Sequence, residues 1–264
     1  MRNQAKALAV ALILAPVAPG FFLAAPAWAR DNLPPDFVYL RDIDPGIAQD
    51  MRYAGPDNFV GRPLPGYDAA ECVLRRDVAL ALRKVQADLA REKLSLKVYD
   101  CYRPARAVAA FVRWAQEPEK VGARDAPTKR FFPALDKRTL FASGYIAAQS
   151  AHSTGTAVDL TLIQLPATHS APYDPAAHYG ACTGAATARA PDSSIDMGTG
   201  FDCFDPKSHT ASPAIAADQK FSRAELVAAM KVHGFHNYFR EWWHFTFGRG
   251  VQLYDFPITP RAPR

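Results

Sequence analysis

Two short segments of the chain carry side chains that suit a catalytic metal site. Residues 150–159 read Ser-Ala-His-Ser-Thr-Gly-Thr-Ala-Val-Asp and supply His152 and Asp159. Residues 241–244 read Glu-Trp-Trp-His and supply Glu241 and His244. Catalytic zinc sites use three such protein ligands, leave one position open for water, and place a further carboxylate nearby as a base. If the two segments meet in space, this set of donors predicts hydrolytic chemistry.

The spacing within each segment sets conditions on the backbone. His152 and Asp159 are seven positions apart, so on one straight strand their side chains would face opposite sides. The chain must therefore turn between them, and Gly155 has the backbone freedom that such a turn needs. Glu241 and His244 are three positions apart, which keeps them close on a helical turn or at the irregular start of a strand. We expect the two intervening tryptophans to pack around the site and lower its dielectric constant.

Other classes of function have weaker support in the sequence. Ser150 and His152 form a Ser-x-His pair, but no Gly-x-Ser-x-Gly elbow of a serine hydrolase accompanies it. The 264-residue chain has a formal net charge of +5, without a stripe of clustered Lys and Arg among aromatic residues. We therefore expect no nucleic-acid partner.

The first 29 residues have the composition of a secretory signal peptide. Arg2 and Lys6 precede an apolar run at 7–15, and Ala-Trp-Ala at 27–29 is a small-x-small cleavage signal. A retained membrane anchor is the alternative, but prolines and a glycine leave the run short for a spanning helix. We expect cleavage after Ala29, one domain at residues 30–264, a secreted and periplasmic protein, and no stable membrane insertion after cleavage.

Four cysteines follow this segment, at Cys72, Cys101, Cys182 and Cys203. An even number of cysteines in an exported chain favours two disulfide bonds. Three pairings are possible on paper, and we favour Cys72 with Cys101 and Cys182 with Cys203 because each pair closes a local loop. Metal binding by cysteine is the weaker alternative, since no Cys-x-x-Cys spacing occurs.

The periodicity of apolar residues predicts helices over 73–92 and 105–116 and strands around 94–98 and 157–162. Ser222 to Glu225 has the form of a capping box that starts a helix ending at Gly234, and Phe245 and Phe247 alternate as in a strand. This mixture predicts an α+β domain. Residues 164–200 have no clear period, and we expect a surface insertion there, held by Cys182–Cys203.

Several motifs in order along the chain resemble the VanX-type zinc D-alanyl-D-alanine dipeptidases. They lie at 52–54, 57–59, 100–104, 150–162, 197–198, 201–202, 208–209, 241–244 and 254–257, so that the resemblance covers residues 37–258. It implies a single α+β domain in which helices pack on a small mixed or antiparallel sheet, a fold shared with the related zinc D-Ala-D-Ala carboxypeptidases.

The resemblance also implies a role for each site residue. His152, Asp159 and His244 would bind one Zn²⁺ per chain, and Glu241 would be the general base for zinc-activated water. Arg103 matches the arginine that stabilises the tetrahedral intermediate, although a structural ion pair is the alternative reading.

Three further positions match the family's substrate pocket. Asp202 would hold the ammonium group of a dipeptide, and Tyr53 and Ser150 would form hydrogen bonds to the substrate or the ligands. Purely structural hydrogen bonding is the alternative for each. The chain departs from the family at Cys101, where some relatives have glycine, and at 164–200, which could reshape the rim of the pocket.

We therefore expect a metallopeptidase that hydrolyses the dipeptide D-Ala-D-Ala in peptidoglycan dipeptide turnover. One alternative is a D,D-carboxypeptidase that acts on peptidoglycan stem peptides with the same metal site. Another is a non-catalytic zinc module that binds cell-wall peptides, which would need neither a base nor an oxyanion donor. Nothing in the sequence indicates the oligomeric state.

Overall fold

A computed structural model describes residues 33–118, 127–168 and 170–261 of the chain. The predicted signal peptide, residues 1–29, lies outside the described residues. Within them, no helix is both long enough and apolar enough to cross a membrane.

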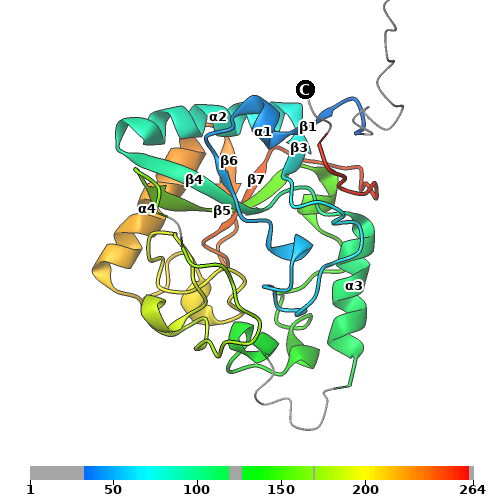
Figure 1. Cartoon of the computed structure of the whole chain (residues 1–264), viewed down its shortest axis with the longest axis vertical. Helices are drawn as coiled ribbons and strands as arrows, with labels where there is room; N and C mark the ends of the chain where they lie inside the picture. The colour runs from blue at the N-terminus through cyan, green and yellow to red at the C-terminus, as the bar shows by residue number, and fades with distance from the viewer. Residues whose placement is uncertain (1–32, 119–126, 169, 262–264) are drawn as a thin grey trace, which may run out of the picture. The chain divides into compact units, whose positions relative to one another are not determined.

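The central element of the fold is a mixed five-stranded sheet with the strand order β2-β4-β5-β7-β6 (Figure 1). Its strands are β2 (Ala48–Gln49), β4 (Leu94–Asp100), β5 (Ala157–Gln164), β6 (Phe235–Asn237) and β7 (His244–Phe247). β2 runs parallel to β4, and the other neighbours are antiparallel. A small antiparallel pair joins β1 (Phe37–Tyr39) to β3 (Val73–Arg75).

The α-helices among the described residues are α1 (Leu40–Ile43), α2 (Arg76–Arg91), α3 (Ala105–Gln116) and α4 (Ala217–Val232). α2 and α4 contact each other and cover one face of the sheet, whereas α3 packs in a second, aromatic cluster (Figure 1). This arrangement confirms the predicted α+β domain with helices packed on a small mixed sheet.

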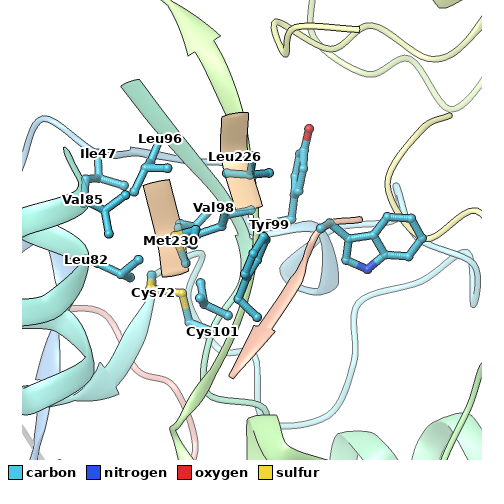
Figure 2. Close-up of a cluster of buried hydrophobic side chains, with 14 of the residues drawn as sticks. Ile47, Cys72, Leu82, Val85, Leu96, Val98, Tyr99, Cys101, Leu226 and Met230 are labelled. Carbon is cyan, nitrogen blue, oxygen red and sulfur yellow. A yellow bond between two sulfur atoms is a disulfide. The ribbon is translucent and has the colours of Figure 1, made fainter. Parts of the chain in front are cut away.

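The main core lies between the sheet and the helices α2 and α4. Leu96 and Val98 of β4 point toward the two helices, as Figure 2 shows. Each such side chain contributes about 1.5–3 kcal/mol to stability when it is fully buried. The helix side chains that meet them include Leu82, Val85, Leu226 and Met230.

Strand β4 is buried along its whole length, and not on one face only as its alternating sequence predicts. Its polar residues can be buried because each has a partner. Lys97 forms an ion pair with Asp192, and Ser95 accepts a hydrogen bond from Gln86 Nε2 at 2.8 Å. Paired polar groups can be buried without the large penalty of isolated ones.

The predicted helix over 73–92 is shorter at its start, because residues 73–75 form β3 and pair with β1. Their apolar side chains fit the helical period equally well, and the pairing partner decides the outcome. The predicted helix over 105–116 is confirmed.

The capping box predicted at Ser222 is wrong. Helix α4 begins at Ala217, and the Gln219 side chain accepts a hydrogen bond from Ala216 N at 2.9 Å. Ser222 lies inside the helix, where its hydroxyl donates to Asp218 O at 3.0 Å. Gly234 follows the helix with φ of +89°, as a glycine beyond a helix end commonly does.

The segment 164–200 has two different parts. Most described side chains up to residue 189 are exposed or half-buried. The later part packs inward: Met197 joins the core, and Ile195 N donates to Leu162 O at 2.9 Å. The last residues of this segment therefore pack against the sheet, whereas the earlier ones lie mostly at the surface.

The structure contains the disulfides Cys72–Cys101 and Cys182–Cys203, with separations of 29 and 21 residues. Loops of these lengths correspond to about 3 kcal/mol of stabilisation each in the chain-entropy model.

The position of the core leads to a stability prediction for Leu160, which has an exposed fraction of 0%. We expect Leu160→Ala to lower the free energy of unfolding by about 2–5 kcal/mol through lost burial and the remaining cavity. Val232→Ala, at a side chain that is 76% exposed, should change it by less than about 0.5 kcal/mol. Urea unfolding measures both, and equal effects would contradict this core.

Candidate active site

A turn at Gly155 brings His152 back toward the sheet. Ser150 Oγ accepts a hydrogen bond from His152 N at 3.2 Å and caps the 3₁₀ turn Ala151–Thr154. Gly155 then adopts φ of +74°, and a Cβ atom there would lie 2.3 Å from Phe37. Only glycine fits this position, so the turn expected from the spacing has a steric basis.

The register of the sheet places the other donors on one face. Asp159 of β5 lies directly opposite His244 of β7, and cross-strand neighbours point to the same side. Since Val158 and Leu160 face the helices, Asp159 faces away from them. An irregularity in β4 after Val98 aligns Asp100 with Asp159, as a β-bulge does.

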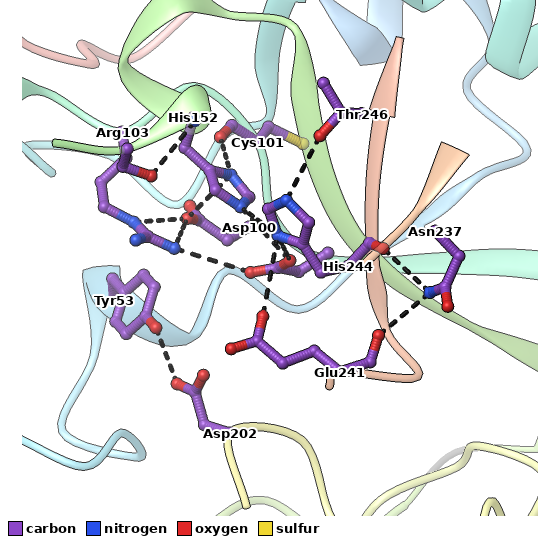
Figure 3. A network of polar contacts seen from close by, with 12 residues as sticks. Tyr53, Asp100, Cys101, Arg103, His152, Asp202, Asn237, Glu241, His244 and Thr246 are labelled. Atoms are coloured by element: carbon purple, nitrogen blue, oxygen red, sulfur yellow. Dashed lines mark hydrogen bonds and ion pairs between the residues drawn. The ribbon is translucent and has the colours of Figure 1, made fainter. Parts of the chain in front are cut away.

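Three potential ligand atoms form a small triangle on this face (Figure 3). His152 Nε2 lies 3.1 Å from His244 Nδ1 and 3.3 Å from Asp159 Oδ1. The distance between His244 Nδ1 and Asp159 Oδ1 is 3.0 Å. A tetrahedral metal with bonds of about 2.0–2.1 Å holds its ligand atoms about 3.3–3.4 Å apart. The triangle therefore fits one tetrahedral metal ion.

Hydrogen bonds behind the triangle orient its members. His152 Nδ1 lies 2.7 Å from the carbonyl of Cys101, to which its N–H donates, so that Nε2 turns its lone pair toward the triangle. Burial would raise the pKa of Asp159, but the two neighbouring histidines hold it below its usual value. The carboxylate is thus ready to act as an anionic ligand.

Glu241 lies beside the triangle, with Oε2 at 3.9 Å from His244 Nδ1. Burial raises the pKa of its carboxyl to about 7, against the opposing effect of the His244 imidazole. A carboxyl group with a pKa near neutrality can both accept and return a proton.

Arg103 enters the pocket from the other side and is held rigidly. Its Nε and Nη2 atoms both lie 2.8 Å from Asp100 Oδ2, and Nη2 lies 3.6 Å from Asp159. The guanidinium carbon sits 4.9 Å from the ring centre of Tyr53 and 5.1 Å from that of Phe111. Its charge is therefore fixed next to the ligand triangle.

Asp100 is the functional residue that the sequence reasoning missed. It is fully buried, accepts a hydrogen bond from Tyr67 OH at 2.6 Å, and lies 3.4 Å from His152 Nδ1. It thereby connects Arg103 to the ligand triangle. The only sequence signal for Asp100 was its place at the start of the 100–104 motif. Its contacts with Arg103 and His152 appear only in the folded structure.

Asp202 and Tyr53 form the far wall of the pocket. Tyr53 OH donates a hydrogen bond to Asp202 Oδ2 at 2.7 Å, and the Asp202 side chain is buried (Figure 3). Burial and the charge of Asp159 raise the pKa of Asp202 well above its usual value. A carboxylate in such a place favours a cationic partner.

One cavity of about 240 Å³ brings together all of the predicted catalytic, metal-binding and substrate-binding residues. They are Tyr53, Arg103, Ser150, His152, Asp159, Asp202, Glu241 and His244. Residues 144–147 and Tyr238 also line the cavity, and no sequence pattern marked them.

The chain is similar to known proteins along most of its length. A family model described as D-Ala-D-Ala dipeptidase matches residues 35–174 and 187–259, leaving 175–186 unmatched within the expected insertion. A D-alanyl-D-alanine dipeptidase of Enterococcus faecium is 31% identical over 225 residues, covering 84% of this chain and 98% of the relative. The D-alanyl-D-alanine dipeptidase of Streptomyces coelicolor is 35% identical over 227 residues, covering 84% of this chain and 98% of the relative. That of Escherichia coli is 29% identical over 210 residues, covering 80% of this chain and 83% of the relative.

The matched ranges span most of the chain and contain every residue of the pocket described above. The pocket residues occur in the order of the motifs described above and meet in one cavity, which agrees with the resemblance. The chain therefore belongs to the D-Ala-D-Ala dipeptidase family of peptidases.

Proposed function

We propose that this protein is a zinc-dependent dipeptidase that hydrolyses D-Ala-D-Ala. The observation that carries the proposal is the triangle of His152, Asp159 and His244, with Glu241 on one side and Arg103 on the other. Two imidazoles and one carboxylate are a ligand set of catalytic zinc. When bound, zinc polarises the scissile carbonyl and makes water acidic enough to attack at neutral pH.

Glu241 is the proton carrier of this proposal. Its carboxylate takes a proton from the attacking water and returns it to the leaving amine. Its distance of 3.9 Å from His244 Nδ1 puts it within reach of a water molecule placed at the open side of the triangle.

Arg103 stabilises the negative charge that develops on the carbonyl oxygen. Two aromatic rings beside it and its hydrogen bond to Asp100 fix its position, so little reorganisation is needed when the charge appears. A preorganised donor of this kind contributes more in a dry pocket than in water.

Asp202 selects the substrate by its amino end. A free ammonium group pairs with the Asp202 carboxylate, whereas an acylated end would leave this buried carboxylate without a cationic partner. The small cavity and this carboxylate favour a dipeptide over the stem peptide of a D,D-carboxypeptidase. A binding module would have no use for Glu241 as a base.

We also propose that the protein acts outside the cytoplasm, in turnover of peptidoglycan-derived dipeptide, after cleavage behind Ala29. The two disulfides support this location, because such bonds persist in oxidising compartments such as the periplasm.

Removal of the proton carrier should separate catalysis from metal binding. We expect Glu241→Gln to retain one zinc per chain while kcat on D-Ala-D-Ala falls by about 10²–10⁴-fold. Metal analysis and a ninhydrin assay for released alanine measure the two quantities. Glu225→Gln on α4 is the matched control and should keep full activity. Wild-type turnover by Glu241→Gln would rule out this role.

Removal of the metal should affect both activity and stability. Dialysis against a strong chelator should abolish hydrolysis and lower the melting temperature, since the metal binds the folded state and balances its buried carboxylates. Added zinc should restore both. A sample dialysed against buffer without the chelator is the control. Full activity of verified metal-free protein would contradict the proposal.

Recognition of the ammonium group should depend on the charge of Asp202. We expect Asp202→Asn to raise KM for D-Ala-D-Ala by about 10–100-fold, the loss of one charged hydrogen bond. N-acetyl-D-Ala-D-Ala, which lacks the ammonium group, should be a poor substrate for the wild type. Its KM should not rise in Asp202→Asn. If the wild type prefers the acetylated dipeptide, the carboxypeptidase alternative is favoured instead.

A further inference from the structure

Each disulfide joins another part of the chain to a cysteine that is close in sequence to an active-site side chain. Cys101 lies two positions before Arg103, and Cys203 directly follows Asp202. Building on the proposed function, we infer that the two disulfides position different halves of the site. Cys72–Cys101 holds the metal-binding half, and Cys182–Cys203 holds the half that recognises the ammonium group.

In the metal-binding half, the main chain of Cys101 contacts a ligand directly. Its carbonyl accepts the 2.7 Å hydrogen bond from His152 Nδ1, and Arg103 N donates to His152 O at 3.2 Å. Between them, Tyr102 N donates to Val73 O at 2.8 Å. Cys72 immediately precedes Val73, so the disulfide and this hydrogen bond tie the same short stretch to β3.

The position of this carbonyl matters because it selects the tautomer and orientation of His152. Loss of a hydrogen-bond partner behind a metal ligand commonly weakens metal binding by about 10–100-fold. Cys72 and Cys101 are both fully buried, so the link is protected in the folded protein. The disulfide thus restrains the Cys101 carbonyl, which orients the proposed ligand His152.

In the ammonium half, the backbone of Asp202 has a conformation that needs support. Its φ of +56° is in the left-handed region, which is unfavourable for most side chains and less so for aspartate. Next to it, Phe201 stacks on Tyr99 with ring centres 4.6 Å apart. On the other side, Cys203 is anchored by its disulfide.

The partner Cys182 is itself fixed to a neighbouring strip of chain. Cys182 N donates to Arg130 O at 2.8 Å, and Gly200 N donates to Cys182 O at 2.9 Å. Phe204 N donates to Phe131 O at 2.8 Å. The disulfide therefore closes a set of contacts on both sides of Asp202, and none of these contacts includes a metal ligand.

The experiment changes only the cysteine that is remote from the site, so that Cys101 and Cys203 stay in place. Cys72→Ala and Cys182→Ala are each compared with the wild type. The zinc dissociation constant of the metal-free proteins is measured by competition with a chelating dye, and kcat and KM are measured on D-Ala-D-Ala. Each variant is the matched control for the other.

We expect Cys72→Ala to bind zinc about tenfold or more weakly. Cys182→Ala should bind zinc within about twofold of the wild type but show a KM several-fold higher with little change in kcat. Unchanged zinc affinity in folded Cys72→Ala, or the same weakening in both variants, would overturn the inference. So would an unchanged KM in Cys182→Ala when the wild type is active.

Circular dichroism establishes whether each variant is folded. If Cys72→Ala is not folded, Cys72→Val replaces it, because valine refills the buried volume. The zinc measurement needs no turnover. A wild-type protein that binds zinc but leaves D-Ala-D-Ala intact would therefore refute the proposed function, while the zinc comparison would still test the positioning role of Cys72–Cys101.

Discussion

The constraint on which this structure depends is the burial of several carboxylates in one small space. Asp159, Asp202 and Glu241 line the pocket, and Asp100 lies directly behind it. Among the described residues that line the pocket, Arg103 carries the only permanent positive charge. Carboxylates taken out of water require partners, or else they become protonated. Burial raises the pKa values of Glu241 and Asp202, as expected for carboxyl groups with little positive charge around them.

A divalent cation at the ligand triangle and an ammonium group at Asp202 would together satisfy this requirement. The metal would balance Asp159 and draw Glu241 toward its charged form, and the substrate would balance Asp202 on arrival. The excess of negative charge thus agrees with the proposed binding of a metal cation and an ammonium group. Asp100 accepts hydrogen bonds from both Arg103 and Tyr67, so this carboxylate holds in place the guanidinium that we propose as the oxyanion donor.

The sequence allowed prediction of those features that depend on local spacing. The helix over 105–116, the turn at Gly155 and the favoured disulfide pairing follow from residues close together in the chain. The candidate site residues were chosen because their motifs are ordered and specific, and one cavity contains them.

What the sequence could not provide depends on distant partners. Residues 73–75 become a strand because β1 pairs with them, and Lys97 is buried because Asp192 reaches it from 95 residues away. The same holds for Asp100, whose importance appears only when the irregularity in β4 aligns it with Asp159. The pocket rim at 144–147 has no periodic pattern, so only the fold shows that it faces the ligands.

The most direct test of the account is a crystal structure of the zinc-loaded protein, with anomalous diffraction recorded on both sides of the zinc absorption edge. We predict one zinc peak per chain, within about 2.0–2.2 Å of His152 Nε2, His244 Nδ1 and an Asp159 oxygen. A zinc peak bound elsewhere, or none at this triangle in protein that contains stoichiometric zinc, would contradict the assignment of this pocket as a catalytic zinc site.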